Sequence, residues 1–149
     1  MLKRLNTLYI VRGLPGSGKS TYASKLADQL GCDYFEADHF FMVDGVYTFD
    51  PMRLGEAHRL CFSAVKKAVQ NGEDVIVSNT FTTIREVRKY VQLAHDFKYN
   101  IVLVHCTGKF GSIHDVPEYT MSAMRARWVS NSYIKKYFGN RYISKISRV

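Results

Sequence analysis

Residues 13–21 restrict the fold more than any other segment, and they read Gly13-Leu14-Pro15-Gly16-Ser17-Gly18-Lys19-Ser20-Thr21. This segment fits the phosphate-binding loop pattern G-x-x-x-x-G-K-[ST]. A β-rich apolar run at residues 7–11 precedes it, and residues 19–30 follow with apolar side chains at helical spacing. A strand, a glycine loop and a helix in this order form a site for nucleotide phosphates, because loop N–H groups and the positive helix end point at the same anion. The alternative is a chance glycine turn in front of a helix.

Two side chains of this loop carry the expected chemistry. Lys19 is expected to reach the β- and γ-phosphates of a nucleotide, and the Ser20 hydroxyl is expected to join the coordination of Mg²⁺. The backbone of Gly13, Pro15, Gly16, Ser17 and Gly18 is expected to surround the phosphate oxygens.

The remaining chain alternates between strand and helix patterns. We expect strands at 34–37, 75–77 and 101–104, and a hairpin around Asp44-Gly45. Helices are expected from Pro51 to about Asn71, from a capping box at Thr83 and Glu86, from Pro117, and from about 130 to 138. The pattern predicts one α/β domain over residues 1–149, with three layers and a mostly parallel sheet flanked by helices. Its ligands should lie at the carboxyl ends of the strands.

Composition narrows the functional class. The 149-residue chain has no apolar run approaching the roughly 20 residues of a membrane span. It shows no leader pattern, and its three cysteines are odd in number and include no C-x-x-C pair, so we expect a cytoplasmic protein.

The formal net charge of +8 is concentrated at the end of the sequence. No acidic residue follows Glu118, whereas seven basic residues do, most of them in the basic segment 130–149. This segment is either a solvated tail or a surface for a polyanion such as nucleic acid. The interleaved aromatic residues are either stacking groups or the apolar side of a helix: Trp128, Tyr133, Tyr137, Phe138 and Tyr142.

Asp38 is the clearest acid at the end of an expected strand. The strands at 75–77 and 101–104 are followed by neutral residues and by His105. Since the second strand of a wound sheet normally neighbours the first, we expect Asp38 to lie close to the phosphate loop. There it would accept the proton of an incoming hydroxyl. A surface cap or a ribose contact is the alternative.

Several further residues are candidates for substrate contacts. His39 lies beside Asp38, and Lys109 lies in the polar segment 107–116, which we expect to be a lid-like loop. Arg125 and Arg127 follow this loop and could bring positive charge to the γ-phosphate, but on a helix two residues two positions apart do not face the same direction. His114 and Asp115 are too few ligands for a metal site.

The chain resembles the small P-loop kinases of the polynucleotide kinase type, a group related to zeta toxins and nucleotide kinases with AAA-type ATP-binding domains. The resemblance covers roughly residues 5–128, on these segments: Gly13–Thr21, Asp38, Tyr47–Pro51, Ala57-His58, Val77–Thr80, and His114–Arg127. Small stand-alone relatives occur in phage and bacterial genomes. Members transfer the ATP γ-phosphate to a 5′-hydroxyl of DNA or RNA.

The resemblance implies a role for each matched position. Lys19, Ser20 and Thr21 would bind ATP and Mg²⁺, and Asp38 would be the general base. Thr80 would lie near the substrate, with Lys109, Arg125 and Arg127 near the lid.

The chain also departs from the family's pattern. His39 replaces a second acid, Phe41 replaces an arginine, and Ser78 and Phe81 replace polar residues of a strand-end motif. A kinase of a nucleoside or other small molecule, or a nucleotide-binding regulatory protein with little catalysis, are the alternatives.

Overall fold

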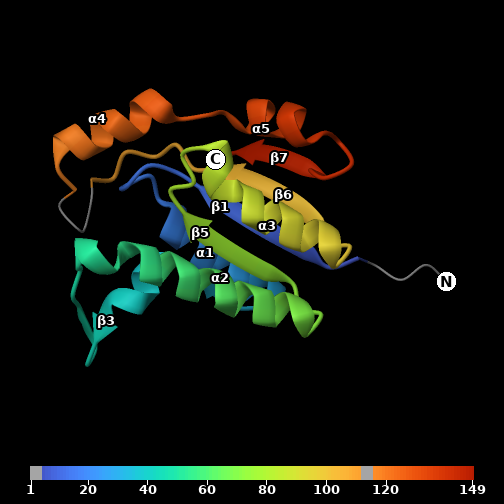
Figure 1. Ribbon diagram of the computed structural model, residues 1–149, viewed down its shortest axis with the longest axis horizontal. Coiled ribbons are helices and arrows are strands. Elements are labelled where there is room, and N and C mark those ends of the chain that lie inside the picture. The colour runs from blue at the N-terminus through green and yellow to red at the C-terminus, as the bar shows by residue number, and fades with distance from the viewer. Residues whose placement is uncertain (1–4, 112–115) are drawn as a thin grey trace.

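The computed structural model describes residues 5–111 and 116–149, and its centre is a parallel β-sheet (Figure 1). Five strands of the described residues form it: Thr7–Arg12 (β1), Tyr34–Phe35 (β2), Val75–Asn79 (β5), Asn100–His105 (β6) and Lys145–Arg148 (β7). Their order is β2-β5-β1-β6-β7, and every neighbouring pair is parallel. The carboxyl ends of the strands therefore share one edge, where ligands of such sheets bind.

Helices cover both faces of the sheet. Leu54–Gln70 (α2), Ile84–Asp96 (α3) and Asn131–Phe138 (α5) pack on one face, and Lys19–Leu30 (α1) packs on the other (Figure 1). Ala23 and Ala27 of α1 pack against Val11, Ile76 and Val104 of the sheet. The predicted three-layer α/β fold is confirmed. No helix in the described ranges is long and apolar enough to cross a bilayer.

Local sequence signals explain several boundaries. Helix α1 occupies the predicted residues 19–30, and α3 begins at the capping box of Thr83 and Glu86. The strands Met42–Val43 (β3) and Val46–Tyr47 (β4) form the predicted hairpin. Its turn residues Asp44 and Gly45 have φ values of 50° and 79°, as a two-residue hairpin turn requires. Pro51–Arg53 forms a 3₁₀ turn (η2) in front of α2.

The expected placement of the second strand is wrong. Strand β2 contains only Tyr34 and Phe35 and pairs with β5, so β5 separates it from β1. All five residues of β5 are buried, as is typical of a strand with a neighbour on each side. The half-buried β2 instead forms the edge of the sheet. Ala37–Phe41 then forms a 3₁₀ helix (η1), so Asp38 lies in this helix rather than directly after a strand.

The basic segment 130–149 is part of the fold. Ile134 of α5 and Ile143 after it are fully buried in the core, and β7 extends the sheet beside β6. Phe138 and Tyr142 also pack against the core, whereas Tyr133 and Tyr137 are about half exposed. The interpretation of this segment as a solvated tail is therefore wrong. The sequence pattern does not predict strand β7.

Truncation of Ile134 tests whether α5 stabilises the whole domain. Ile134→Ala removes a fully buried side chain, and we expect it to lower the free energy of unfolding by about 2–5 kcal/mol. Tyr133→Ala, on the exposed side of the same helix, should change it by less than about 0.5 kcal/mol. Urea unfolding measures both values. Equal, small effects of the two substitutions would show that α5 folds separately from the core.

Candidate nucleotide-binding site

The glycine loop forms a concave turn between β1 and α1. Gly16 and Gly18 have φ values of 80° and 88°, in the left-handed region that glycine adopts without strain. Such a backbone directs successive N–H groups toward one centre and forms an anion-binding nest. Gly18 is the N-cap of α1, and no acidic side chain occupies the first turn of that helix. The positive helix end therefore faces the loop without a competing carboxylate in its own first turn.

Ser17 supplies a further donor within the loop. Its side chain is almost fully buried against Gly13, where an added Cβ would come within 2.1 Å of the Ser17 Oγ. Among the described residues, this hydroxyl has no hydrogen-bond partner. A buried donor without a partner is costly, and phosphate oxygens are suitable acceptors for it. The loop thus fits a phosphate group.

Lys19 and Ser20 meet an acidic side chain that the sequence analysis missed. The Ser20 hydroxyl donates to Glu36 Oε2 at 2.8 Å, and Glu36 Oε1 lies 3.1 Å from His39 Nε2. Burial raises the pKa of Glu36, but the hydrogen bonds from His39 and Ser20 outweigh burial and leave the pKa below its ordinary value. Burial lowers the pKa of Lys19, and the nearby charges of Glu36 and Asp38 partly restore it. The Lys19 ammonium donates to the Leu14 carbonyl of the loop at 3.5 Å, and both carboxylates raise its pKa through their charges.

These oxygens suit a hard divalent cation. Mg²⁺ is usually held by one or two carboxylate or hydroxyl groups together with substrate phosphates, rather than by an all-protein cage. Ser20 and Glu36 match that donor set beside the loop. Within residues 5–111 and 116–149, no cluster of three or more His, Cys, Asp or Glu side chains could hold a metal by itself. The residues present fit a cation shared with a nucleotide.

Asp38 is held by two neighbouring elements. Ala37, the residue before it, donates its backbone N–H to the buried Asn79 Oδ1 at 2.8 Å, which fastens η1 to the carboxyl end of β5. The Tyr47 hydroxyl, from the hairpin, donates to Asp38 Oδ1 at 3.2 Å. Burial, followed by the charge of Asp38, raises the pKa of Tyr47 to about 12. Asp38 thus has a fixed position between the carboxyl end of β5 and the hairpin, although β2 does not neighbour β1.

The other candidate residues are placed less closely together. Thr80 directly follows β5 at the carboxyl edge of the sheet and is half-buried. His39 packs edge-on against the Tyr34 ring at 5.2 Å, besides its contact with Glu36. Lys109 is exposed in the loop after β6. Thr21, in the first turn of α1, is also exposed. His114 and Asp115 lie outside the described residues.

The two lid arginines face different partners. Both belong to Glu118–Arg127 (α4). Arg125 donates to Glu118 on the exposed side of the helix, whereas the Arg127 Nε donates to Thr82 Oγ1 at 2.9 Å. Thr82 follows β5 closely, so Arg127 is directed toward the carboxyl edge of the sheet and Arg125 is not.

Arg12, the residue before the loop, is fully buried and organises this edge of the sheet. Its guanidinium donates to the carbonyls of Phe81 and Val129, each at 2.7 Å, and to Asn131 Oδ1 at 2.6 Å. The group also lies 4.4 Å from the centre of the Trp128 ring. Burial lowers the pKa of Arg12 to about 10. The sequence pattern assigns Arg12 no role, because an arginine at the end of a strand is an ordinary basic residue there.

Comparisons with known proteins agree with this geometry. The model of the family described as AAA domain matches residues 8–109. Human NEDD4-binding protein 2 is 36% identical over 97 residues, which are 64% of this chain and 6% of that protein. A chain of the Pnkp1/Rnl/Hen1 RNA repair complex has a TM-score of 0.65 and 21% identity, covering 92% of this chain and 47% of its own length. The APS kinase of Mycobacterium tuberculosis has a TM-score of 0.54 and 14% identity, covering 84% and 98%.

The parallel sheet, the glycine loop and the lysine that follows it define a P-loop protein with the fold of small P-loop kinases. The chain belongs to the AAA domain family. It spans a small part of NEDD4-binding protein 2 and about half of the RNA repair chain.

Replacement of Arg12 tests whether its guanidinium shapes the site. Arg12→Lys keeps a positive charge, but an ammonium group cannot donate hydrogen bonds to Phe81, Val129 and Asn131 in the planar geometry of the guanidinium. We expect a loss of about 2–4 kcal/mol of unfolding free energy, because buried acceptors lose their donor. Trp128 is the single tryptophan, so its fluorescence emission should also shift. Arg88→Lys, at an exposed position, is the control, and similar effects of both substitutions would contradict the assigned role.

Proposed function

We propose that this protein transfers the γ-phosphate of ATP to a hydroxyl group, with the 5′-hydroxyl of a nucleic acid as the favoured acceptor. The observation that carries the proposal is the fixed position of Asp38, on an element fastened by Asn79 to the carboxyl end of β5 and hydrogen-bonded to Tyr47 of the hairpin. A carboxylate held in this way can accept the proton of an acceptor hydroxyl during phosphoryl transfer.

The chain's own residues supply most of the mechanism. The loop backbone and Lys19 hold the phosphates, and Ser20 with Glu36 would hold Mg²⁺, which neutralises phosphate charge when bound. Asp38 accepts the proton of the acceptor hydroxyl while the acceptor oxygen forms its bond to the γ-phosphorus. The bond from that phosphorus to the bridging oxygen breaks, and its electron pair leaves with ADP. Tyr47, through its hydrogen bond, orients the Asp38 carboxylate.

The contacts of Arg125 and Arg127 indicate which of the two arginines would approach the transferred phosphate. Arg127 is directed toward the strand ends through Thr82, whereas Arg125 is paired with Glu118 on the exposed side of α4. We therefore assign Arg127 to the transferred phosphate, and Arg125 and Lys109 to the lid surface. We assign Thr80, which follows β5, and His39, in η1 beside Asp38, to contacts with the acceptor.

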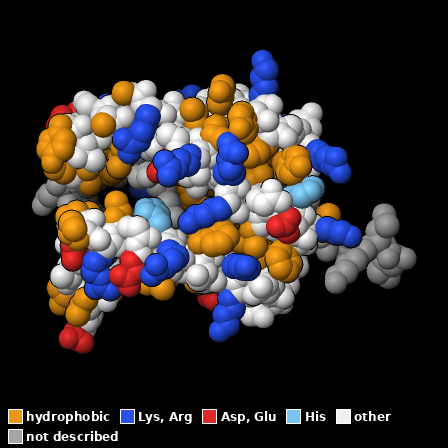
Figure 2. All heavy atoms as spheres, in the orientation of Figure 1, with side chains coloured by type: hydrophobic (Ala, Val, Ile, Leu, Met, Phe, Trp, Pro, Cys, Tyr) orange, Lys and Arg blue, Asp and Glu red, His pale blue; other side chains and the backbone are white. Residues whose placement is uncertain are grey.

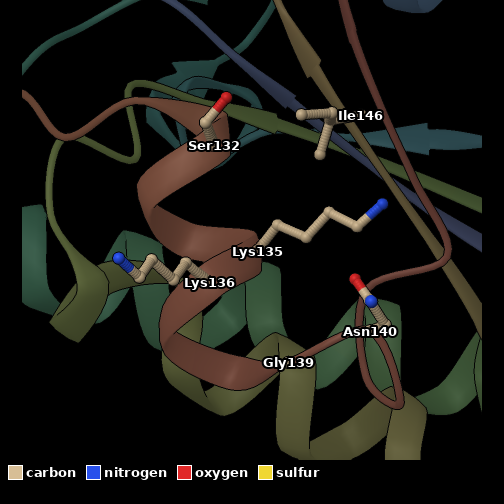
Figure 3. A pocket seen from close by; sticks show the side chains of 6 residues that line it. All are labelled: Ser132, Lys135, Lys136, Gly139, Asn140 and Ile146. Atoms are coloured by element: carbon tan, nitrogen blue, oxygen red, sulfur yellow. The ribbon is translucent and has the colours of Figure 1, made fainter.

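Surface charge supports a nucleic-acid acceptor. Lys and Arg side chains predominate over acidic ones on the face that carries α2, α3 and α5 (Figure 2). An open pocket of about 460 Å³ lies between α5 and the start of β7. The Lys135 side chain extends from α5 into the space between Ile146 and Asn140, and Ser132 also lines the pocket (Figure 3). Ammonium, hydroxyl and amide groups are suitable donors for a phosphate backbone.

Exposed aromatic rings accompany these charges. Tyr133 and Tyr137 of α5 are about half exposed, and Arg88 of α3 donates to the Tyr137 hydroxyl at 2.8 Å. Basic groups interleaved with exposed rings favour single-stranded nucleic acid, because the rings stack on bases while the charges bind phosphates. Trp128 does not belong to this surface, since it packs against His105 and Arg12.

A small-molecule acceptor is the second candidate, and one observation favours it. Phe41 occupies the position where polynucleotide kinases have an arginine, and it is buried against the rings of Tyr47 and Phe49. This position therefore offers no charge to an acceptor phosphate.

Substitution of Asp38 tests the base assignment. Asp38→Asn should reduce phosphate transfer about 10²- to 10⁴-fold, because it removes the proton acceptor, while ATP binding persists. Asp44→Asn, an exposed carboxylate in the hairpin turn, is the matched control and should leave the rate unchanged. Transfer from radiolabelled ATP to 5′-hydroxyl oligonucleotides and to nucleosides measures both. Wild-type rates in Asp38→Asn would refute the mechanism, and labelling of nucleosides alone would replace the nucleic-acid acceptor by a small molecule.

Charge reversal on α5 tests the nucleic-acid surface. The double substitution Lys135→Glu and Lys136→Glu should weaken oligonucleotide binding and lower the slope of log K against log salt by about 0.7 for each phosphate that these lysines neutralise. Lys25→Glu, on α1 at the opposite face, should change neither beyond the effect of net charge. Fluorescence anisotropy of a labelled oligonucleotide at several salt concentrations measures the slope. Equal slopes in both variants would exclude α5 from binding.

A further inference from the structure

The loop after β6 is fastened to the outside of the phosphate loop. Gly108 donates its N–H to the Ser17 carbonyl at 3.1 Å, and Phe110 donates its N–H to the Gly16 carbonyl at 2.8 Å. Both acceptors belong to the loop that surrounds the phosphates. The backbone of residues 108–110 therefore has a fixed position beside the nucleotide site.

These bonds hold the aromatic ring of Phe110 at the entrance to α1. One edge of the ring faces Gly18 and Gly108: a Cβ added there would lie 3.0 Å and 2.2 Å, respectively, from the Phe110 Cε2. A Cβ at Gly108 would also lie 2.8 Å from the Ser17 carbonyl oxygen, so glycine at this position allows the two loops to approach each other closely. Yet Phe110 is 79% exposed, so its faces are not covered by the core. It is a ring with a defined place and accessible π-faces.

We propose that Phe110 is the stacking platform for the base of the nucleoside triphosphate. This inference rests on the proposed function only in requiring that the loop binds a triphosphate, and it does not require transfer. With the phosphates at the N-terminus of α1, the sugar and base must leave the loop along its rim, and Phe110 lies on that rim beside Gly18. No residue of the loop itself, from Gly13 to Thr21, has an aromatic side chain.

Stacking on this ring has consequences for donor selection. A base stacked on an aromatic side chain contributes about 1–3 kcal/mol, and every base has a π-face. We therefore expect ATP and GTP to bind similarly and the pyrimidine triphosphates, with smaller rings, to bind more weakly. A donor site that reads bases through hydrogen bonds would separate ATP from GTP instead.

Calorimetry with ATP and inorganic tripolyphosphate tests the platform. Phe110→Ala should weaken ATP binding about 5- to 150-fold, which corresponds to the stacking energy, and leave the affinity for tripolyphosphate unchanged. Phe110→Trp should retain ATP affinity, because a larger ring still stacks. Phe97→Ala removes a partly exposed phenylalanine after α3, at the opposite end of the sheet, and should change neither affinity.

The possible results are distinct. Equal weakening of ATP and tripolyphosphate would show that Phe110 only supports the loop backbone, and unchanged ATP affinity would show that the base lies elsewhere; either result overturns the proposal. A selective loss of ATP affinity in a protein that transfers no phosphate would uphold the platform and refute the kinase. Wild-type protein that binds neither ligand would refute both.

Discussion

The buried guanidinium of Arg12 is the interaction on which the site depends. Arg12 is the last residue of the central strand β1. Its guanidinium donates to the Phe81 carbonyl in the segment after β5 and to the Val129 carbonyl in the segment between α4 and α5. It also binds Asn131, whose amide in turn donates to the Ser147 carbonyl of β7 at 3.1 Å. A buried charge is tolerated only when its donors are satisfied, so this group fixes three chain segments at once. The phosphate loop begins at the next residue and thus starts from a rigid base.

Glu36 and Asp38 have different surroundings, which suit them to different roles in the proposed mechanism. Glu36 accepts hydrogen bonds from Ser20 and His39, which keep it ionised and turn it toward the side where a cation would bind. Asp38 instead faces the hairpin, where Tyr47 donates to it. In the proposed mechanism, Glu36 therefore serves the cation and Asp38 serves the acceptor hydroxyl. The replacement of the family's second acid by His39 leaves this division intact, because Glu36 provides the carboxylate from two positions before Asp38.

The sequence predicts what depends on local pattern and misses what depends on tertiary contacts. Helix α1, the hairpin turn and the capping box of α3 follow from residue spacing, and all three are confirmed. The sequence pattern places Glu36 in the expected strand at 34–37 and gives it no role. Its hydrogen bond with Ser20 joins two residues far apart in the local pattern, so residue spacing cannot predict it. Strand β7 has a largely polar sequence without a clear strand pattern. It is extended because it pairs with β6, which is a tertiary contact. The expected position of Asp38 near the loop rests on a wrong strand order, and Asn79 of the intervening β5 is what brings η1 there.

In the proposed mechanism, the donor and acceptor sites belong to different parts of the chain. The loop, Lys19 and Ser20 lie between β1 and α1, whereas Asp38, Tyr47 and Phe41 belong to η1 and the hairpin. The matched family region, residues 8–109, includes both parts. The hairpin packs on the buried Phe41, whose ring contacts those of Tyr47 and Phe49, so substitutions there alter the surroundings of the base without touching the phosphate loop. Under the proposed function, the acceptor can therefore change while the nucleotide site stays constant. Phe41 is suited to such a role, because its buried ring offers no charge to an acceptor and packs the element that holds Asp38 against the hairpin.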